Sequence, residues 1–337
     1  MKPVIQALGH EPLYPLLARA GIGLPIEIQN NLRAGRVLVG GERAQADTEV
    51  RPGDRLRIGA LGYRIEASPR SGHLLVLPAD LADTTTPIRG RRLVQCGYHK
   101  CLTMYFRKVF SRTVRSPLTG LGRFTHFFHR LDEFYRRCED FSIMSISGHA
   151  IDLDRFDDVL VTRFVRDPRD LLVSGYYYHR RAAESWCDLA DPEDSDWQVV
   201  NGKVPAGLAP GQSFARFLNE VPQEEGLIAE LDFREYHFAS MRAWPDDDAR
   251  VRLFRYEDLV GNEAACYDQM FRFYRFGAVS RFVGRYYARR YRAARRQARS
   301  QHIRNASSGQ WRQHFTPEVE RRFNERYGDL LEKLGYE

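Results

Sequence analysis

The chain is poor in cysteine, with only five among 337 residues, and these are scattered without a Cys-x-x-Cys pair. An odd, scattered set is typical of reduced thiols and argues against a disulfide framework or a structural zinc site. No apolar run approaches the roughly 18–20 residues that span a bilayer. The first residues, MKPVIQALGHEPLYP, lack the sustained apolar core of a signal peptide. We therefore expect a cytoplasmic protein without a transmembrane segment.

The composition is that of a soluble globular protein, with 43% hydrophobic and 28% charged residues. The length favours about two domains. The 51 Lys and Arg against 44 Asp and Glu give a net charge of +7, and residues 281–300 alone hold eight Arg and no acid. This stretch is either a solvated helix or a basic surface for an anionic partner, such as RNA or a lipid surface.

Residues 1–67 are expected to form a small α+β module. Residues 11–21 and 24–35 have apolar side chains at helical spacing and end on Gly, and RVLVGGERA and RPGDRLRIGALGYRIEA then alternate as strands around turns. LLARAGIG, LRAGRVLVGGE and RPGDRLRI make the module resemble the alpha-L RNA-binding domain. That family usually carries Arg or Lys where this chain has Leu24-Pro25-Ile26-Glu27. Docking or dimerisation and RNA binding therefore both stay open as roles. Residues 68–90 read as a linker.

Residues 91–337 alternate between strand and helix patterns, which predicts an α/β fold with a parallel sheet flanked by helices. Strands are expected in RLVQCG, SIMSIS, DDVLVTRFV and RVRLFRY, and helices in KCLTMYFRKVF, RDLLVSGYYYHRRAAE and from Asn262 onward. Ligands of such folds bind beyond the carboxyl ends of the strands.

The stretch LVQCGYHKCLTMYF leads from a strand through Gly97 into a helix opened by Lys100 and Thr103. A tight turn before a helix N-terminus is an anion site, because free amides and the positive dipole end face the ligand. The stretch is no Walker A loop, since Gly-Lys-Ser/Thr is missing, and no strand-end Asp for Mg²⁺ follows.

Three further motifs follow in order. In VTRFVRDPRDLLVSGYYYHR a strand ends at Arg166, and Ser174 lies two turns into the next helix. Arg supplies a planar fork for phosphate oxygens, and Ser adds a hydroxyl donor. RLFRYEDL ends a strand on Tyr256, and HIRNASSGQWRQHFT places Arg304 seven residues before Trp311.

Together these four motifs resemble the cytosolic and bacterial sulfotransferases, which use 3′-phosphoadenosine 5′-phosphosulfate (PAPS) as sulfuryl donor and have a P-loop-like α/β fold. The resemblance covers residues 91–337. It implies that Lys100 and Thr103 bind the phosphosulfate, that Tyr105 stacks on adenine, and that Tyr256 lies near the adenosine. The implied donor-binding set comprises Gly97, His99, Lys100, Cys101, Leu102, Thr103, Met104, Tyr105, Arg166, Ser174, Tyr256, Arg304, Asn305 and Ala306. The resemblance implies no metal.

The chain departs from the family pattern within these motifs. Leu102 stands where the family has Gly, so we expect either a different backbone approach to the sulfate or a residue that avoids positive φ. Met104 removes a hydroxyl, and Asn305 and Ala306 replace Lys and Gly. Weaker donor binding and a degraded site are both open outcomes.

Sulfuryl transfer also needs a base for the acceptor proton and a cation for the leaving phosphate. Lys100 is the expected cation. His149, in SIMSISGHAID, follows a strand and precedes the Arg166 strand, as the catalytic His does in the family, and imidazole suits proton abstraction near neutrality. His99 is the rival base, and a histidine that satisfies only a turn is the alternative role for His149.

Residues 184–212 read as a long insertion, either an acceptor-site lid, as Trp186 and Trp197 suggest, or a flexible surface loop. YYYHRR at 176–181 favours helix packing over a sugar platform. The leading function is sulfuryl transfer to a hydroxyl or amine of a carbohydrate, lipid or small metabolite. The alternatives are a P-loop kinase-like nucleotide enzyme and a non-catalytic RNA-binding adaptor.

Overall fold

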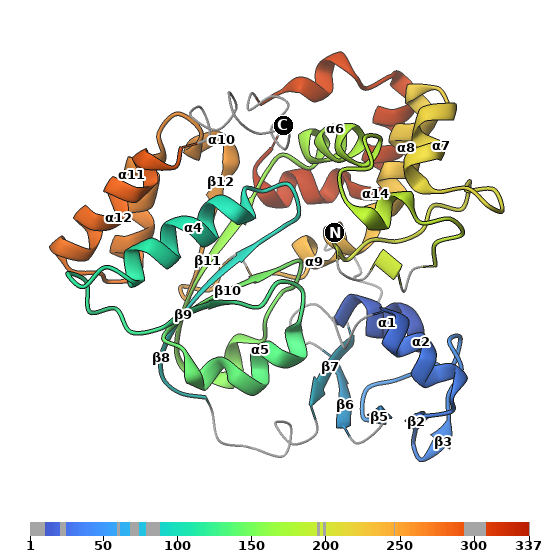
Figure 1. Ribbon diagram of the computed structural model, residues 1–337, viewed down its shortest axis with the longest axis horizontal. Helices are drawn as coiled ribbons and strands as arrows, with labels where there is room; N and C mark the ends of the chain where they lie inside the picture. The colour runs from blue at the N-terminus through green and yellow to red at the C-terminus, as the bar shows by residue number, and fades with distance from the viewer. Residues whose placement is uncertain are drawn as a thin grey trace, which may run out of the picture.

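The computed structural model describes residues 11–20, 25–58, 61–67, 74–78, 88–193, 196–197, 200–245, 247–292 and 308–336. Its N-terminal module, drawn in blue in Figure 1, begins with helices α1 (Leu13–Ala20) and α2 (Pro25–Arg33). An antiparallel sheet follows with the order β3-β2-β5-β6-β7. Its strands are β2 (Val37–Val39), β3 (Glu42–Arg43), β5 (Arg55–Ile58), β6 (Leu61–Ala67) and β7 (Leu74–Pro78). The short strands β1 (Glu11–Pro12) and β4 (Glu49–Val50) pair separately.

Two glycines form the predicted turn of the first hairpin. Gly40 and Gly41 connect β2 to β3 with φ values of 61° and 97°. A two-residue turn with positive φ at both positions matches the twist of the flanking strands, and glycine takes that conformation without a Cβ penalty. The two helices followed by a small sheet therefore appear as the sequence predicted.

The expected linker 68–90 is wrong in its bounds. Strand β7 lies inside this range and pairs with β6 from Tyr63–Pro78 to Ala67–Leu74, so it is the edge strand of the first sheet. The next strand, β8 (Ile88–Gly97), already begins before Arg91. The segment LLVLP buries Leu74 and Val76 in the module core, which gives this strand a packed face.

The second domain is built on the predicted parallel sheet. All its neighbouring strands are parallel, in the order β12-β11-β8-β10-β9. The strands besides β8 are β9 (Phe124–His126), β10 (Ile143–Ser147), β11 (Phe156–Val165) and β12 (Val251–Arg255). The larger helices are α4 (Thr103–Val114), α5 (Leu131–Arg137), α6 (Pro168–His179), α7 (Phe214–Glu220), α8 (Gln223–Phe233), α9 (Glu235–Arg242), α11 (Glu263–Phe273), α12 (Ala278–Arg290) and α14 (Pro317–Leu334).

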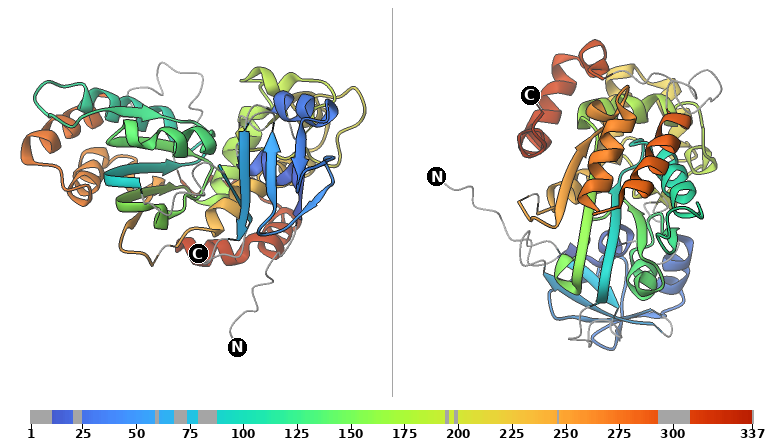
Figure 2. Two further views of the ribbon diagram at one scale, coloured as in Figure 1. Left: turned by 90° about the horizontal axis from the view of Figure 1, so that it is seen from below. Right: turned by 90° about the vertical axis from the view of Figure 1, so that its left-hand side faces the viewer.

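Alternating residues of the central strands divide the core between the two faces of the sheet. Leu93 and Phe164 face a large cluster shared with α4, α6, α8, α11 and α14, whereas Val94 and Val161 face a smaller one with α5. Figure 1 shows α4, α11 and α12 together at one end of the domain, and α6, α8 and α14 at the other. Figure 2 shows the N-terminal sheet standing beside the domain, where β7 contacts α5. The parallel sheet of the second domain is therefore covered on both faces, as parallel sheets require.

The five cysteines, Cys96, Cys101, Cys138, Cys187 and Cys266, are all buried and all free thiols. None of the helices in the described ranges is long and apolar enough to cross a membrane.

Part of the segment expected to be a lid or flexible insertion packs into the core, while many of its described residues are exposed. Trp186 and Trp197 are buried, and Trp197 Nε1 donates to the Trp186 carbonyl at 3.2 Å. Trp186 lies on the short 3₁₀ helix η3 (Ser185–Asp188) and stacks on Phe233 of α8 with a centroid distance of 5.5 Å. Tyr176 and Tyr178 of YYYHRR are buried as well, which confirms the prediction of helix packing.

Candidate active site

The expected site residues lie at one edge of the sheet because parallel strands end on the same side. Lys100 follows β8, Arg166 follows β11 and His149 follows β10. β8 lies between β11 and β10, and the Gly148 amide donates to the Gly97 carbonyl at 2.9 Å. The fold therefore brings the predicted cation, the predicted phosphate ligand and the predicted base to neighbouring strand ends.

The loop after β8 contains two left-handed residues that are not glycine. Lys100 has φ 70°, and Leu102, which precedes the first residue of α4, has φ 60°. Such a conformation costs a side-chain-bearing residue about 1–3 kcal/mol. The expectation that Leu102 avoids positive φ is therefore wrong, and the loop keeps the conformation that a glycine would take there.

Hydrogen bonds inside the loop fix its turn. The Thr103 hydroxyl and the Cys101 amide both donate to the Tyr98 carbonyl, at 3.2 and 3.0 Å. The Cys101 thiol points into the core, and burial raises its pKa to about 12. The Thr103 hydroxyl proton is therefore used in a hydrogen bond within the turn. Cys101 could contact a phosphosulfate only through its backbone. Met104, on the first turn of α4, is 55% exposed.

Lys100 has an aromatic partner on α6. Its Nζ lies 3.4 Å from the centroid of the Tyr178 ring, a cation–π contact. Burial lowers the pKa of Lys100 to about 7, and the positive charges of Arg234 and Arg166 act in the same direction. An anion bound beside the ammonium would reverse this destabilisation.

His99 lies beside Lys100 and faces Glu184. The Glu184 carboxylate accepts hydrogen bonds from the Tyr178 hydroxyl and from Trp186 Nε1, each at 2.6 Å, and lies 3.8 Å from His99 Nε2. The approach of His99 and the hydrogen bonds from Tyr178 and Trp186 hold the pKa of Glu184 well below its usual range. Burial lowers the pKa of His99 well below 6.5 despite the nearby carboxylate, so the imidazole is neutral at pH 7.

Arg166 and the Tyr256 motif form one unit. The Arg166 guanidinium lies 4.4 Å from the centroid of the Tyr256 ring, and both side chains are buried. The Glu257 carboxylate accepts the Asp167 amide at 3.0 Å and the Tyr336 hydroxyl at 2.8 Å. Strand β12 is thereby connected to the start of α6, where Asp167 caps the helix. Ser174 lies half-buried on α6, two turns after Arg166.

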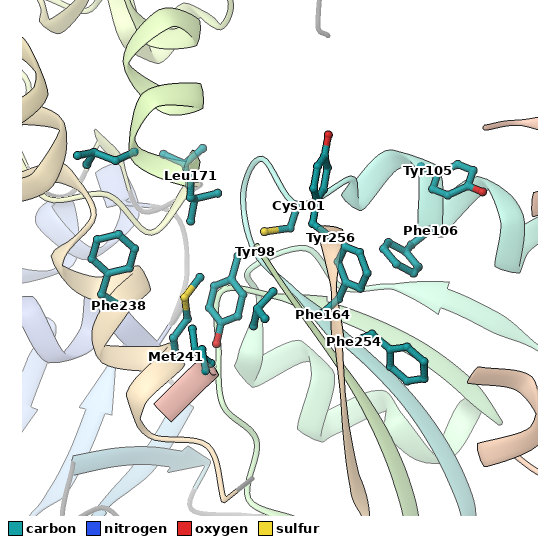
Figure 3. Packing of buried hydrophobic residues seen from close by; sticks show 14 of the residues in the cluster. Tyr98, Cys101, Tyr105, Phe106, Phe164, Leu171, Phe238, Met241, Phe254 and Tyr256 are labelled. Atoms are coloured by element: carbon teal, nitrogen blue, oxygen red, sulfur yellow. The ribbon is translucent and has the colours of Figure 1, made fainter. Parts of the chain in front are cut away.

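The aromatic ring of Tyr105 is buried and not accessible from solvent. Its side chain is buried beside Phe106 on α4 (Figure 3), and its hydroxyl donates to the Ala288 carbonyl of α12 at 2.8 Å. A second ring, Tyr267, meets it edge-on at 5.7 Å. This arrangement joins α4 to α11 and α12, and it does not fit the expectation that Tyr105 stacks on adenine.

Arg304, Asn305 and Ala306 lie outside the described residues. The residues that follow them are attached to α6, since the Asp170 carboxylate accepts the Gly309 amide at 2.6 Å and the Trp311 amide at 3.0 Å. The Arg169 guanidinium lies 4.0 Å from the Trp311 ring centroid. The Gly-x-Trp part of the fourth motif therefore meets the first turn of the Arg166–Ser174 helix.

His149 is buried after β10 and makes a hydrogen bond that identifies its tautomer. Its Nε2 lies 2.9 Å from the backbone carbonyl of His129. A carbonyl only accepts, so Nε2 carries the proton and Nδ1 is the nitrogen that can take another.

Two residues that the sequence analysis did not single out also face this edge. Arg234, between α8 and α9, and His237, on α9, are fully buried. Within the described residues, both terminal nitrogens of Arg234 and both ring nitrogens of His237 have no hydrogen-bond partner. Each such buried polar atom without a partner costs about 1–3 kcal/mol. The motif FREYH contains an Arg and a His one turn apart, but nothing in its spacing indicates that they turn inward.

Comparisons with known proteins give three results. No protein with a curated description matches the chain. Among solved structures, a mouse sulfotransferase, SULT7A1, complexed with PAP shares 13% identity at a TM-score of 0.44, with 79% of this chain and 95% of that one covered. Retinol dehydratase complexed with retinol and PAP shares 13% identity at a TM-score of 0.43, with 96% of each chain covered.

The third result concerns the family. The family described as Sulfotransferase domain matches residues 159–335, slightly more than half of the chain. The matched range contains Arg166, Ser174 and Tyr256, whereas the Lys100 loop and His149 precede it. With its parallel sheet and these motifs in place, the chain belongs to the sulfotransferase domain family, whose enzymes transfer sulfuryl groups.

Proposed function

We propose that this enzyme transfers the sulfuryl group of PAPS to a hydroxyl or amine of a carbohydrate, lipid or small-metabolite acceptor. The observation that carries the proposal is the placement of Lys100 and Arg166 at the carboxyl ends of the adjacent parallel strands β8 and β11. The donor has an anionic group at each end of its ribose, and two cations at neighbouring strand ends match that pattern.

The residues of this edge fit the donor chemically. Lys100 would bind the bridging 5′-phosphosulfate together with the amides that open α4. Arg166 and Ser174 would bind the 3′-phosphate, and the approach of Gly309 to α6 supports Arg304 as a further ligand. Within the described residues, Arg166 Nε is buried without a hydrogen-bond partner, as expected of a guanidinium whose acceptor is a ligand.

The proposed reaction is an in-line displacement at sulfur. The acceptor oxygen or nitrogen forms a bond to sulfur while the bond between sulfur and the 5′-phosphate oxygen breaks. The acceptor proton passes to Nδ1 of His149, the bonding electrons stay on the departing phosphate, and the Lys100 ammonium stabilises that charge. The products are the sulfated acceptor and adenosine 3′,5′-bisphosphate (PAP).

Two variants test this assignment. His149→Ala should lower kcat for labelled sulfate transfer by about 10²–10⁴-fold, the usual contribution of a general base. The dissociation constant for PAP, measured by calorimetry, should stay nearly unchanged. His126→Ala is a matched control, because His126 lies on β9 and bonds the Ser145 hydroxyl at 2.9 Å. His149→Ala with full turnover, or with loss of PAP binding, would reject the base assignment; His99→Ala then tests the rival.

Arg166→Gln should weaken PAP binding by about 10- to 100-fold, since a hydrogen bond to a charged group contributes about 1.5–3 kcal/mol. Arg115→Gln, an exposed arginine after α4, should leave binding unchanged.

Donor binding should not need Mg²⁺; a metal requirement would favour a kinase-like enzyme instead.

We also propose an anionic partner for residues 281–300 and a cytoplasmic location. Arg281 and Arg285 pair with Asp268, at 3.2 and 3.8 Å, whereas Arg289 and Arg290 end α12 exposed. The location is supported by the free state of all five thiols.

A further inference from the structure

A buried charged cluster lies between α6 and the junction of α8 with α9. The Glu230 carboxylate accepts Arg234 Nε at 2.8 Å and pairs with His179 Nδ1 at 2.7 Å. All three side chains have no exposed surface. Gly175 of α6 allows this packing, because a Cβ there would collide with both Glu230 and Arg234.

The cluster leaves hydrogen-bond donors without acceptors. Glu230 uses one oxygen for Arg234 and the other for His179, so it meets only Nε of the guanidinium. In the described part of the chain, both terminal nitrogens of Arg234 and both nitrogens of His237 lack a partner. A guanidinium fork is built for two parallel hydrogen bonds to an oxyanion. A pair of anionic oxygens would therefore supply the hydrogen-bond acceptors that the guanidinium lacks.

The position of the cluster favours the acceptor over the donor. The proposed donor ligands Arg166 and Tyr256 follow β11 and β12, on one side of β8. Besides Arg234, the charged groups that act on His237 are His99 of the Lys100 loop, His179 of α6 and His129. His129 follows β9, and its carbonyl lies 2.9 Å from Nε2 of His149, so His237 is close to the proposed base. Figure 3 shows Phe238 and Met241 of α9 on one side of Tyr98, together with Leu171 of α6, and Tyr256 on the other.

We propose that Arg234 and His237 bind an oxyanion of the acceptor, a carboxylate or a phosphate ester, so that the enzyme sulfates anionic hydroxyl compounds. This inference rests on the proposed function. The acceptor must approach sulfur from the side opposite the leaving phosphate. The proposed base His149 follows β10, and His129, which acts on His237, follows β9. The guanidinium would then orient the attacking oxygen by holding a remote part of the same molecule.

The test uses pairs of hydroxyl compounds that differ in their acid group: 3-hydroxybenzoate and its methyl ester, glucuronic acid and glucose, glycerol 3-phosphate and glycerol. Labelled sulfate transfer gives kcat/KM for each, and calorimetry gives binding with and without PAP. At least one acid should exceed its neutral partner by about 10- to 100-fold, as a charge-assisted hydrogen bond predicts. The carboxylate and phosphate pairs distinguish the two sources of the oxyanion.

Arg234→Gln should bring that ratio close to one. PAP affinity is compared at pH 6, where Lys100 is protonated with or without the charge of Arg234, and should stay unchanged there. His237→Phe is the second variant, because it removes both ring nitrogens but keeps an aromatic ring beside Phe233, and it should reduce the preference for acids. Its melting temperature is measured alongside to separate this effect from a loss of folding. Arg216→Gln, an exposed arginine that pairs with Glu220 on α7, is the control.

Equal use of acids and neutral partners, a preference that survives Arg234→Gln, or no binding of any acid would overturn the inference. If PAP fails to bind but an acid still binds in an Arg234-dependent way, the oxyanion site stands and the proposed donor is rejected. If PAP binds and neutral compounds are sulfated equally well, the proposed function stands and this inference falls.

Discussion

At the scale of single residues, the site depends on an ammonium in an unfavourable setting. Lys100 lies among Arg234 and Arg166, so burial and these charges bring its pKa to about 7. The family resemblance predicted this lysine. It could not predict its low pKa, because burial and the charge of Arg234, which is 134 positions away in the chain, lower that pKa. Leu102 is a second example, because its left-handed backbone follows from the turn that Thr103 and Cys101 close around Tyr98 rather than from its own preference.

The pKa of Lys100 predicts how donor binding depends on pH. Below about pH 7 the ammonium is already formed; above it, binding of an anion must be accompanied by proton uptake, so PAP affinity should fall by up to tenfold per pH unit between pH 7 and 9. Calorimetry across that range, in buffers of different ionisation enthalpy, measures both the affinity and the proton uptake. Lys100→Met should bind weakly with a flat profile, and Lys108→Met of α4 should behave as the wild type. A flat wild-type profile would contradict the prediction.

At the scale of elements, the contact between α6 and α8 depends on a missing side chain. Gly175→Ala should lower the free energy of unfolding by about 1–3 kcal/mol, the usual cost of overpacking, because its Cβ would meet Glu230 and Arg234. Gly328→Ala is the matched control on α14, where a Cβ meets nothing within 4 Å, and should be neutral or stabilising. Urea unfolding of both variants measures the difference. Equal stabilities would show that α6 moves aside freely.

The sequence predicted those elements whose pattern is local. The strand, tight turn and helix around Gly97 are confirmed, and so is the strand before Arg166, which ends one residue earlier, at Val165. Buried runs and Asp167-Pro168 indicate these elements directly. Strand β7 lies in the range that was read as a linker: LLVLP has only five residues, and its pairing with β6 is not evident from its own pattern. Arg234 and His237 were not predicted, since their buried side chains come near Lys100 only when α9 packs against strand ends that are distant in the chain.

At the scale of the whole molecule, charge is concentrated rather than spread. The chain carries +7, and residues 281–300 contain eight arginines. In the N-terminal module, Arg33 approaches Glu193 at 3.8 Å, and Arg64 pairs with Glu66. We therefore expect polyanion binding to depend on the end of α12 more than on the module.

Replacing Arg289, Arg290 and Arg292 by Gln tests this expectation. The plot of log affinity for single-stranded RNA against log salt should lose about two units of slope, since each phosphate contact on a single strand contributes about 0.7. Replacing Arg36, Arg51 and Arg55 of the module is the comparison and should change the slope less. The opposite ranking would favour RNA binding by the module.

The five buried thiols can serve as built-in chemical probes of local unfolding. A maleimide reacts with thiolate, and burial raises the pKa of each of these sulfhydryls, so the folded chain should stay unmodified while any region that opens is tagged permanently. Cys101 would report on the turn beside Lys100 and Cys138 on the segment after α5, and mass spectrometry of the peptides would separate the two. Slower tagging of Cys101 alone in the presence of PAP would trace the nucleotide to that turn, with no assay of turnover and no knowledge of the acceptor.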